Sequence, residues 1–377
     1  MKVCNFQLVG EELVNESNVP IIESNVNLVL TFSSKNHLQN PNTFNSIKSQ
    51  FPNADIVLCS TAGEILQEKV LDNSIIVTAL EFEKTTIVSS IVDIDDFKTT
   101  EGATIALAKK LQKENLQYIL LISDGSKVNG SELINGLYKH IDRKVTITGG
   151  LAGDGSKFES TLVGLNNHAK EGQIVAIGFY GNSLVVNHGS QGGWDVFGLE
   201  KRVTKSDKNV LTEFEDQNAL EIYKKYLGEE SKNLPGSALL FPLSVLMPGS
   251  EKSVVRTILS IDEVNKTMTF AGDIPVGSQI RFMKANFDKI TNAASYAAAF
   301  ATDKIELPTF SLLISCVGRK LILGEKVNQE VEAVSKTYKN KTILSGFYSY
   351  GELSPFNEGG KCQLHNQTMT ITSFYEK

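Results

Sequence analysis

The chain has 377 residues, of which 41% are hydrophobic and 21% are charged, the composition of an ordinary globular protein. Its formal net charge of -6 argues against a nucleic-acid binder, which needs a basic face for phosphates, and against docking on an acidic membrane. A chain of this length exceeds what one hydrophobic core usually organises, so two domains are expected.

The cysteines and the apolar runs indicate a cellular location. Four cysteines are scattered along the chain: Cys4, Cys59, Cys316 and Cys362. Their spacing gives no CxxC clip for a metal or a redox pair, and sparse thiols fit a reducing compartment. The N-terminal residues show no signal peptide, and no apolar run reaches the 18 or more residues of a membrane helix. A cytoplasmic location is therefore expected.

Short runs of β-branched and aromatic residues alternate with helical patterns through the first half of the chain. Strands are predicted over 26–32, 54–60, 74–80, 86–91, 117–123, 144–149, 161–164, 173–180 and 184–187, and helices over 99–111 and 130–141. The strand at 117–123 is apolar on both sides of its alternation. It is therefore expected to be central, with both faces covered.

The second half repeats the mixture. Strands are predicted over 253–261, 266–270, 279–283, 310–315, 342–348 and 367–374, and helices around 220–227, 287–301 and 327–338. The polar stretch 205–216 is the weakest join, which divides the chain into domains 1–210 and 211–377. The fold class is therefore predicted as α/β with mixed α+β character. Two related domains are expected, with mixed, largely buried sheets flanked by helices.

A glycine followed by an acid ends three of the predicted strands. The three pairs are Gly63-Glu64, Gly153-Asp154 and Gly351-Glu352. The same Leu-Leu-Ile-Ser run also occurs upstream of the second and third pairs, at 120–123 and 312–315, and each run is followed by a helix and a strand. This repetition suggests two similar α/β halves whose turns occupy comparable places.

The glycine–acid turns form a candidate ligand site. Glycine lets a ligand approach the backbone, and a carboxylate accepts hydrogen bonds from an ammonium. Arg319, just past a buried strand, can bind a carboxylate through its planar fork. Ligands of α/β sheets favour the carboxyl ends of strands. The predicted binding residues are Ser60, Thr61, Gly63, Glu64, Gly150, Gly153, Asp154, Cys316, Arg319, Tyr348, Tyr350, Gly351, Glu352 and His365.

Other interpretations of these residues stay open. Any single glycine–acid pair is better explained as turn chemistry, with a solvated acid, and the ligand interpretation depends on the three copies together with Arg319. The glycine-rich run 149–155 resembles a phosphate loop, but a strand rather than a helix is predicted after it, which disfavours phosphate. No catalytic residue and no metal ligand is assigned.

Cysteine and histidine give two alternative functions. Cys59 and Cys316 end buried strands and His365 lies in another motif, so a Cys-dependent hydrolase or transferase is one alternative. A cysteine at such a place is more often a small hydrophobic residue. The five histidines show no metal-ligand spacing, although a single one suffices as an axial haem ligand. No cofactor is expected, and haem is the alternative.

An ordered set of motifs carries a family resemblance. CSTAGEI at 59–65, GGLAGDG at 149–155 and the stretch from Trp194 to Thr204 resemble the N-terminal FIST domain. IPVGSQIRFM at 274–283, SCVGR at 315–319, GFYSYGE at 346–352 and HNQTMT at 365–370 resemble the C-terminal FIST domain. Each motif alone is weak, but the set spans most of the chain in the family's order.

The resemblance implies a stand-alone sensory domain of intracellular signalling that binds a small ligand, with amino acids suggested. Some family members bind haem and respond to nitric oxide. Many carry a kinase, cyclase or chemotaxis module, for which this chain has no room, so a separate signalling protein such as a kinase or cyclase is the expected partner. Capture of an amino acid or similar polar metabolite in a crevice between the domains is the expected mechanism, without catalysis.

Overall fold

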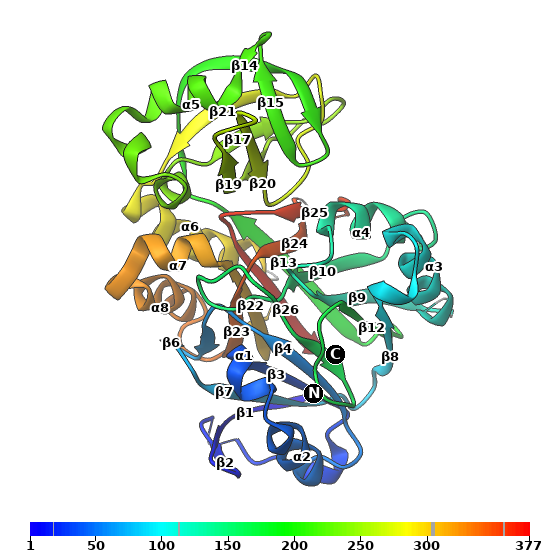
Figure 1. Ribbon diagram of the computed structural model, residues 1–377. Coiled ribbons are helices and arrows are strands. Elements are labelled where there is room, and N and C mark those ends of the chain that lie inside the picture. The colour runs from blue at the N-terminus through cyan, green and yellow to red at the C-terminus, as the bar shows by residue number, and fades with distance from the viewer. Residues whose placement is uncertain (18, 112–113, 303–305, 357–358) are drawn as a thin grey trace.

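The computed structural model describes residues 1–377 except 18, 112–113, 303–305 and 357–358 (Figure 1). The described residues form three six-stranded sheets that share a body, and a smaller lobe with a fourth sheet, at the top of Figure 1. Helices flank the sheets of the body, and the strands are mixed in direction. The predicted α/β class with mixed sheets is therefore confirmed.

The first sheet has the strand order β11-β4-β3-β7-β1-β2. Its strands are β1 (Lys2–Val9), β2 (Glu12–Asn15), β3 (Leu28–Ser33), β4 (Asp55–Ser60), β7 (Ile75–Glu81) and β11 (Val163–Leu165). β3 and β4 are parallel and are connected through α1 (Lys35–Leu38) and α2 (Pro41–Gln50).

The second sheet has the order β25-β24-β10-β9-β12-β8. Its strands are β8 (Thr86–Asp93), β9 (Leu116–Ser123), β10 (Thr146–Leu151), β12 (Gln173–Tyr180), β24 (Gly351–Pro355) and β25 (Cys362–His365). β9 and β10 are parallel, with α3 (Thr100–Leu111) before β9 and α4 (Gly130–Leu137) between the two strands.

The third sheet has the order β13-β26-β22-β23-β5-β6. Its strands are β5 (Glu64–Leu66), β6 (Lys69–Leu71), β13 (Leu184–Gln191), β22 (Phe310–Cys316), β23 (Ile343–Ser349) and β26 (Met369–Glu376). α6 (Phe287–Phe300) precedes β22, and α7 (Val317–Leu323) and α8 (Asn328–Thr337) connect β22 to the parallel β23.

The three sheets are three copies of one unit. In each unit a first strand is followed by a parallel pair joined through helices, and a last strand returns between the first strand and the pair, antiparallel to both. The four strands are β1, β3, β4, β7 in unit 1, β8, β9, β10, β12 in unit 2, and β13, β22, β23, β26 in unit 3. The segments leading to Gly153 and Gly351 therefore share a topology, as the sequence echo suggested, and the segment leading to Gly63 is a third copy.

Each unit lends a strand to another unit's sheet. After β4 the chain crosses to the third sheet, where β5 pairs with β23. After β10 it crosses to the first sheet, where β11 pairs with β4. After β23 it crosses to the second sheet, where β24 pairs with β10. The exchange is cyclic, and the three glycine–acid turns lie where the chain crosses.

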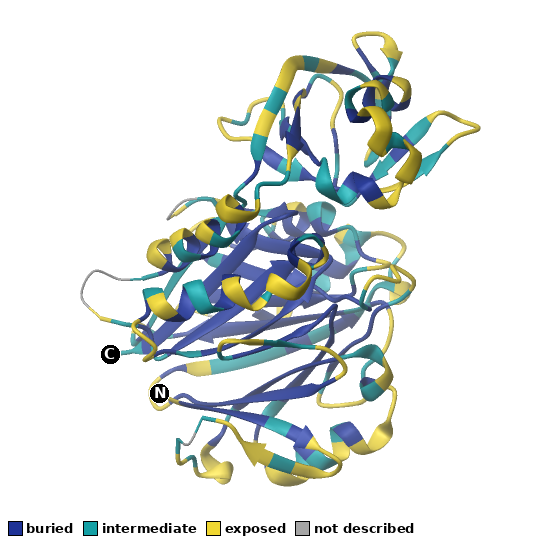
Figure 2. Ribbon diagram, turned by 90° about the vertical axis from the view of Figure 1, so that its left-hand side faces the viewer, coloured by how far each residue is buried: buried dark blue, intermediate teal, exposed yellow. Residues whose placement is uncertain are grey.

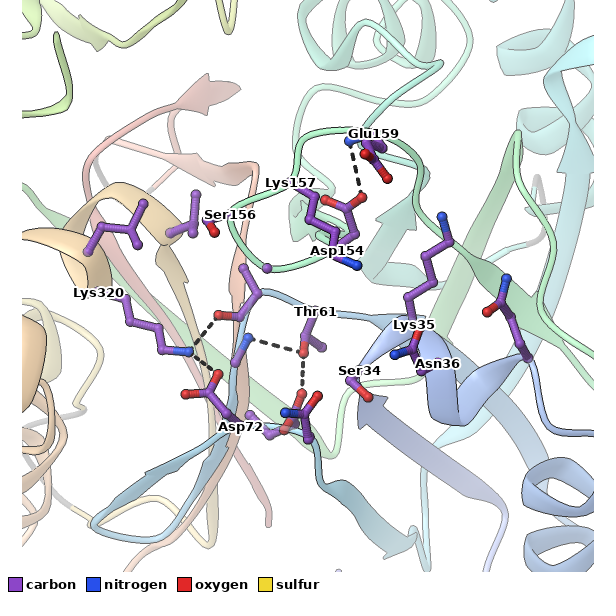
Figure 3. A pocket seen from close by; sticks show the side chains of 18 residues that line it. Ser34, Lys35, Asn36, Thr61, Asp72, Asp154, Ser156, Lys157, Glu159 and Lys320 are labelled. Carbon is purple, nitrogen blue, oxygen red and sulfur yellow. Dashed lines mark hydrogen bonds and ion pairs between the residues drawn. The ribbon is translucent and has the colours of Figure 1, made fainter. Parts of the chain in front are cut away.

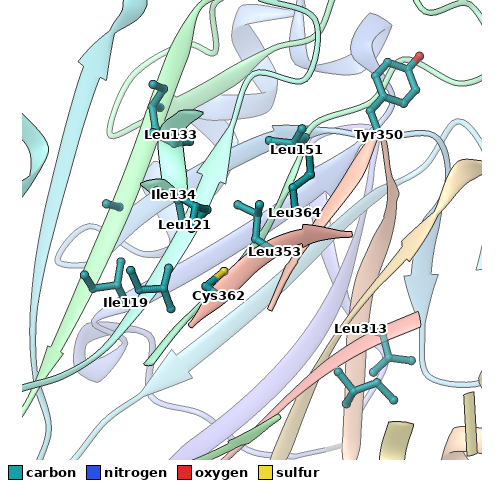
Figure 4. Packing of buried hydrophobic residues seen from close by; sticks show 14 of the residues in the cluster. Ile119, Leu121, Leu133, Ile134, Leu151, Leu313, Tyr350, Leu353, Cys362 and Leu364 are labelled. Atoms are coloured by element: carbon teal, nitrogen blue, oxygen red, sulfur yellow. The ribbon is translucent and has the colours of Figure 1, made fainter. Parts of the chain in front are cut away.

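Side-chain alternation explains the layers. One side of each parallel pair faces a core shared by the three sheets, with Phe32, Leu120 and Leu312 among its residues. The other side lies under helices, as Leu121 does beside Leu133 of α4 (Figure 4). Figure 2 shows the sheets buried between helices whose outer faces are exposed. Strand β9 is covered on both faces, as its apolar sequence predicted.

The fourth sheet is inserted into unit 3, between β13 and α6. Its elements are β14 (Asp195–Asp207), β15 (Val210–Phe214), β16 (Gln217–Asn218), α5 (Ala219–Leu227), β17 (Leu243–Leu246), β18 (Val254–Arg256), β19 (Ile258–Asp262), β20 (Thr267–Phe270) and β21 (Gln279–Lys284). They enclose a separate core around Phe214, Tyr223 and Phe282. The polar stretch 205–216 forms the β14–β15 hairpin of this lobe, so residues 210 and 211 lie within the lobe.

Short 3-10 helices fill several connections: Glu23–Asn25, Ile94–Asp96, Gly228–Asn233, Gly236–Leu240 and Gly324–Lys326. Among the described residues, no helix has the length and apolar character needed to cross a bilayer.

Candidate functional site

The three crossing points are tied together by backbone hydrogen bonds. The bonds run from Ala62 N to Tyr348 O (2.8 Å), from Gly153 N to Ser60 O (2.9 Å) and from Tyr350 N to Leu151 O (3.1 Å). Each turn is thus hydrogen-bonded to the end of a strand that belongs to another unit. This brings the carboxyl ends of all three parallel pairs to one place, where ligands of α/β sheets usually bind.

Glu64 and Glu352 have the same surroundings. Thr61 Oγ1 donates to Glu64, and the backbone N–H and hydroxyl of Ser74 donate to it at 3.1 and 2.7 Å. Ser349 Oγ donates to Glu352 at 2.9 Å, and the N–H and hydroxyl of Thr368 donate to it at 3.1 and 2.9 Å. The residue order is also the same, because Ser74 and Thr368 each precede the returning strand of their unit.

Burial decides the ionisation of these two carboxyl groups. Desolvation raises the pKa of Glu64, although the hydrogen bonds from Thr61 and Ser74 act in the opposite direction. Desolvation raises the pKa of Glu352 to about 8 for the same reason. Burial therefore favours the protonated form of Glu352 at neutral pH.

Asp154 differs from both. Its carboxylate accepts hydrogen bonds from the backbone N–H groups of Phe158 (2.9 Å), Glu159 (3.1 Å) and Ser160 (3.0 Å), and from the hydroxyl of Tyr350. The ring of Tyr350 stacks on Phe158 with centroids 4.6 Å apart. Asp154 and Tyr350 therefore shape the loop that follows the second turn.

A polar cavity of about 570 Å³ opens beside the first and second turns (Figure 3). It is bounded by the start of α1, the turn at 61–64, the β6–β7 connection, the loop at 154–159 and α7. Its lining residues are Ser34, Lys35, Asn36, Gln39, Thr61, Ala62, Gly63, Glu64, Asp72, Asn73, Asp154, Gly155, Ser156, Lys157, Glu159, Val317, Lys320 and Leu321. Of the predicted site residues, Thr61, Gly63, Glu64 and Asp154 line this cavity.

Lys320 reaches the cavity from α7 of unit 3. Its side chain is 16% exposed, its ammonium donates to Ala62 O at 2.9 Å, and it forms an ion pair with Asp72. It also lies 5.8 Å from the ring centroid of Tyr348. A Cβ on Gly63, whose φ is +141°, would lie 2.5 Å from the Lys320 Nζ atom. The first glycine is therefore needed so that this lysine can lie across the turn.

Arg319, the neighbour of Lys320, points the other way and does not reach the cavity. Its guanidinium is fully buried and forms an ion pair with Glu330 at 2.7 Å. It also donates to the carbonyls of Ile290 (2.8 Å) and Gly192. The expected clamp of Arg319 with Glu64 or Glu352 is therefore not assembled. Lys320 was not predicted as a site residue because the sequence of a short helix does not determine how the helix is oriented after a buried strand. The side chain that faces the cavity therefore could not be identified.

The remaining predicted residues are buried around the crossings. The Ser60 hydroxyl accepts from Leu162 N at 2.8 Å and secures β11. The Tyr348 hydroxyl donates to Glu330 at 2.6 Å, behind the first turn. Gly150 packs against Ile314, and Gly351 against Leu364 and Leu151. These residues hold the crossings in place and do not line the cavity.

The residues of the cysteine alternative are also enclosed. All four cysteines are buried, and burial raises the pKa of the Cys59 and Cys316 thiols, which disfavours the reactive thiolate. His365 is buried, its Nε2 lies 2.9 Å from Ser354 O, and desolvation lowers its pKa to about 4. His365 lines a separate cavity of about 290 Å³ at the junction with the lobe.

The main cavity does not fit haem. None of the residues that line it is His, Cys, Met or Tyr, the side chains that ligate haem iron. Nor do the described residues contain a group of three His, Cys, Asp or Glu side chains able to hold a metal ion.

The fold and the cavity together define a class: three interlocked α/β units with a polar, ligand-sized cavity at their strand ends. The FIST N domain matches residues 27–217 and the FIST C domain matches residues 219–355. The chain therefore belongs to the FIST family, whose domains are sensory domains that bind small ligands.

Two further comparisons add little. A search of curated proteins finds no match. Among solved structures, a cyanuric acid hydrolase from A. caulinodans aligns at 6% identity, over 95% of this chain and 92% of that one, with a TM-score of 0.34.

Proposed function

We propose that this protein is a sensor that binds a small polar metabolite, such as an amino acid, in the cavity beside the first and second turns. The observation that carries the proposal is the meeting, in one polar cavity of about 570 Å³, of Lys320 with the first glycine–acid turn. Such a volume suits a small ligand, and a few convergent polar groups suffice to orient it.

The cavity offers both signs of charge. Lys35, Lys157 and Lys320 can meet an acidic group of the ligand, while Glu159 can accept hydrogen bonds from an ammonium. Ser34 adds a buried hydroxyl oxygen that has no hydrogen-bond partner among the described residues. This mixture favours a zwitterion or a similar polar metabolite over a purely apolar ligand.

The place of the cavity supports a sensory role. Its walls come from all three units, because α1 belongs to unit 1, the loop at 154–159 to unit 2 and α7 to unit 3. A ligand that touches three units selects the arrangement of the units that fits it best. A separate signalling protein in the cytoplasm, such as a kinase or cyclase, would bind differently to the new arrangement of the units.

A thermal-shift screen with amino acids and other polar metabolites tests the proposal. A ligand raises the melting temperature by mass action. Glu64→Gln and Glu352→Gln form a matched pair, because both carboxyl groups accept the same hydrogen bonds but only Glu64 lines the cavity. Ligand affinity should fall in Glu64→Gln and in Ser34→Ala, and stay unchanged in Glu352→Gln. The ligand would lie elsewhere if affinity fell equally in both glutamate variants. The same would follow if the affinity for every hit were unchanged in Glu64→Gln and in Ser34→Ala.

A further inference from the structure

The two members of the Lys320–Asp72 ion pair are held very differently. Lys320 is 16% exposed, lies across Gly63 and is bonded to the carbonyl of Ala62. The side chain of Asp72 is 68% exposed and makes no other hydrogen bond to a described residue. The lysine is therefore fixed by the fold, whereas the aspartate is attached to it by one contact at the rim of the cavity (Figure 3).

Among the described residues, Asp72 is the carboxylate that forms an ion pair with Lys320. Glu64, at the next position after Gly63, forms no ion pair with a described residue, because its oxygens are held by Thr61 and Ser74. Burial also raises the pKa of Glu64, which favours its neutral form. An ammonium with little exposure needs an anion beside it, because an unpaired buried charge is costly. Since Asp72 is held by this one contact, another anion can replace it.

The third unit shows that the turn itself needs no charge. Asp72 lies two residues before Ser74, and Asn366 lies two residues before Thr368, the counterpart of Ser74. Asn366 is uncharged and fully buried, yet the same hydrogen bonds to the glutamate form beside it. The turn therefore does not require a charge at the position of Asp72. The charge of Asp72 is instead a feature of the cavity that this residue lines.

We propose that Asp72 is an internal stand-in for a carboxylate of the ligand. A ligand that enters the cavity places its own carboxylate on the Lys320 ammonium, and Asp72 is released to solvent. The inference rests on the proposed function, to which it adds the chemical class of the ligand and the residue with which it competes. No covalent bond changes, and the step exchanges one ion pair for another.

The fold limits what this release can move. Val70 is fixed because its N–H donates to Asn328 Oδ1 at 2.8 Å, and Ser74 is fixed on Glu64. Asp72 and Asn73 lie between these two points, in the short connection from β6 to β7. Within it, Asn73 O contacts the His37 ring of α1 at 2.9 Å. Ligand binding is therefore expected to change hydrogen exchange at Asp72 and Asn73 more than in the strands of the third sheet.

Titration calorimetry with succinate, with its uncharged analogue succinamide and with inorganic phosphate tests the inference on the full chain. Succinate should bind and succinamide should not. Asp72→Asn removes the competing anion and should tighten succinate binding about two- to five-fold, the range expected from an exposed ion pair. Lys320→Met should abolish binding. Asp72 is exposed, so its variant reports on binding even where Lys320→Met fails to fold.

Glu101→Gln is the matched control. Glu101 is also an exposed acid paired with a lysine, Lys139, at 2.7 Å, but it lies outside the cavity. Its substitution should leave the succinate Kd unchanged. The inference is overturned if the succinate Kd of Asp72→Asn is unchanged or larger than that of the wild type, or if succinamide binds as tightly as succinate. The inference is also overturned if phosphate binds and its affinity rises in Asp72→Asn as that of succinate does. Negative charge alone, and not a carboxylate, would then select the ligand.

The inference and the proposed function fail in different ways. If neither succinate nor phosphate binds the wild type or Asp72→Asn, the carboxylate exchange is wrong. A metabolite hit that depends on Glu64 and Ser34 would still support the cavity as the ligand site. If no hit depends on those two residues, the cavity itself is wrong.

Discussion

Glu64 and Glu352 accept hydrogen bonds from equivalent residues although they belong to different units: a hydroxyl three positions before the acid, and the N–H and hydroxyl of the residue before the returning strand. Only Glu64 lines the main cavity. The two residues therefore separate what the turn needs in order to fold from what a ligand needs in order to bind.

The pH dependence of stability should change in Glu352→Gln. The folded protein raises the pKa of Glu352 to about 8, above the value of about 4.3 expected in the unfolded chain. Between these values the folded state holds one more proton, so the free energy of unfolding falls as pH rises. Glutamine removes this contribution, so the variant should lose less stability than the wild type on going from pH 6.5 to 8.

Urea denaturation at several pH values measures this difference. His365 works in the opposite direction, because its pKa is lowered to about 4 and its contribution to stability grows as pH rises from 4 to about 6.5. Most of that contribution is gained below pH 6.5, and the remainder is common to wild type and variant, so the difference between their profiles from pH 6.5 to 8 reports on Glu352. Parallel wild-type and variant profiles in this window would contradict the protonated state of Glu352.

Gly63→Ala should displace Lys320. The added Cβ would lie 2.5 Å from the Lys320 Nζ atom, and the φ of +141° is unfavourable for alanine. Gly10→Ala is the control, because Gly10 also has a positive φ, +65°, but its Cβ would meet nothing within 4 Å. Both variants should lose about 1–3 kcal/mol from backbone strain. Only Gly63→Ala should also weaken ligand binding, and unaltered binding would contradict the assigned role of Lys320.

Arg319→Met should destabilise the protein strongly. It leaves the Glu330 carboxylate buried without its cation, a change that typically costs about 3–5 kcal/mol. The double variant Arg319→Met, Glu330→Gln removes both charges and should be more stable than Arg319→Met alone. Denaturant midpoints of the two variants measure this coupling. Additive losses would show that the two residues do not act as a pair.

The four thiols should be unreactive in the folded protein. All four are buried, and burial raises the pKa of each thiol, so little thiolate is exposed to a reagent. A thiol-specific chromogenic reagent should titrate four groups only after a denaturant is added. One rapidly reacting thiol in the native protein would reopen the cysteine-dependent alternative.

Much of the fold could be predicted from local patterns. The strands at 117–123 and 310–315 and the helix at 287–301 were found because their apolar periodicity is strong, and the structure confirms them as β9, β22 and α6. β14 was missed because most of its 13 residues are exposed or half-buried, which leaves no alternating apolar pattern. The number of units was also underestimated, because unit 1 lacks the Leu-Leu-Ile-Ser run of the other two.

The candidate site was predicted less completely, for a physical reason. The turn residues Thr61, Gly63 and Glu64 carry a local signal, whereas Lys320, Asp72 and Ser34 reach the same cavity only through tertiary packing. Arg319 and Lys320 are adjacent in sequence and differ by the direction that α7 gives to each side chain. That direction depends on the burial of Arg319 against Glu330, a contact between α7 and α8.

The cyclic exchange of strands makes the two halves of the family match mutually dependent. The N domain range, 27–217, contains β5 and β10, whereas their partners β23 and β24 lie in the C domain range, 219–355. A chain cut at their boundary would leave β10 and β23 as open edges, and both pieces would expose surfaces prone to association. The two matched ranges are therefore halves of one cooperative folding unit, and neither is expected to be expressed alone as a monomeric, native-like fragment.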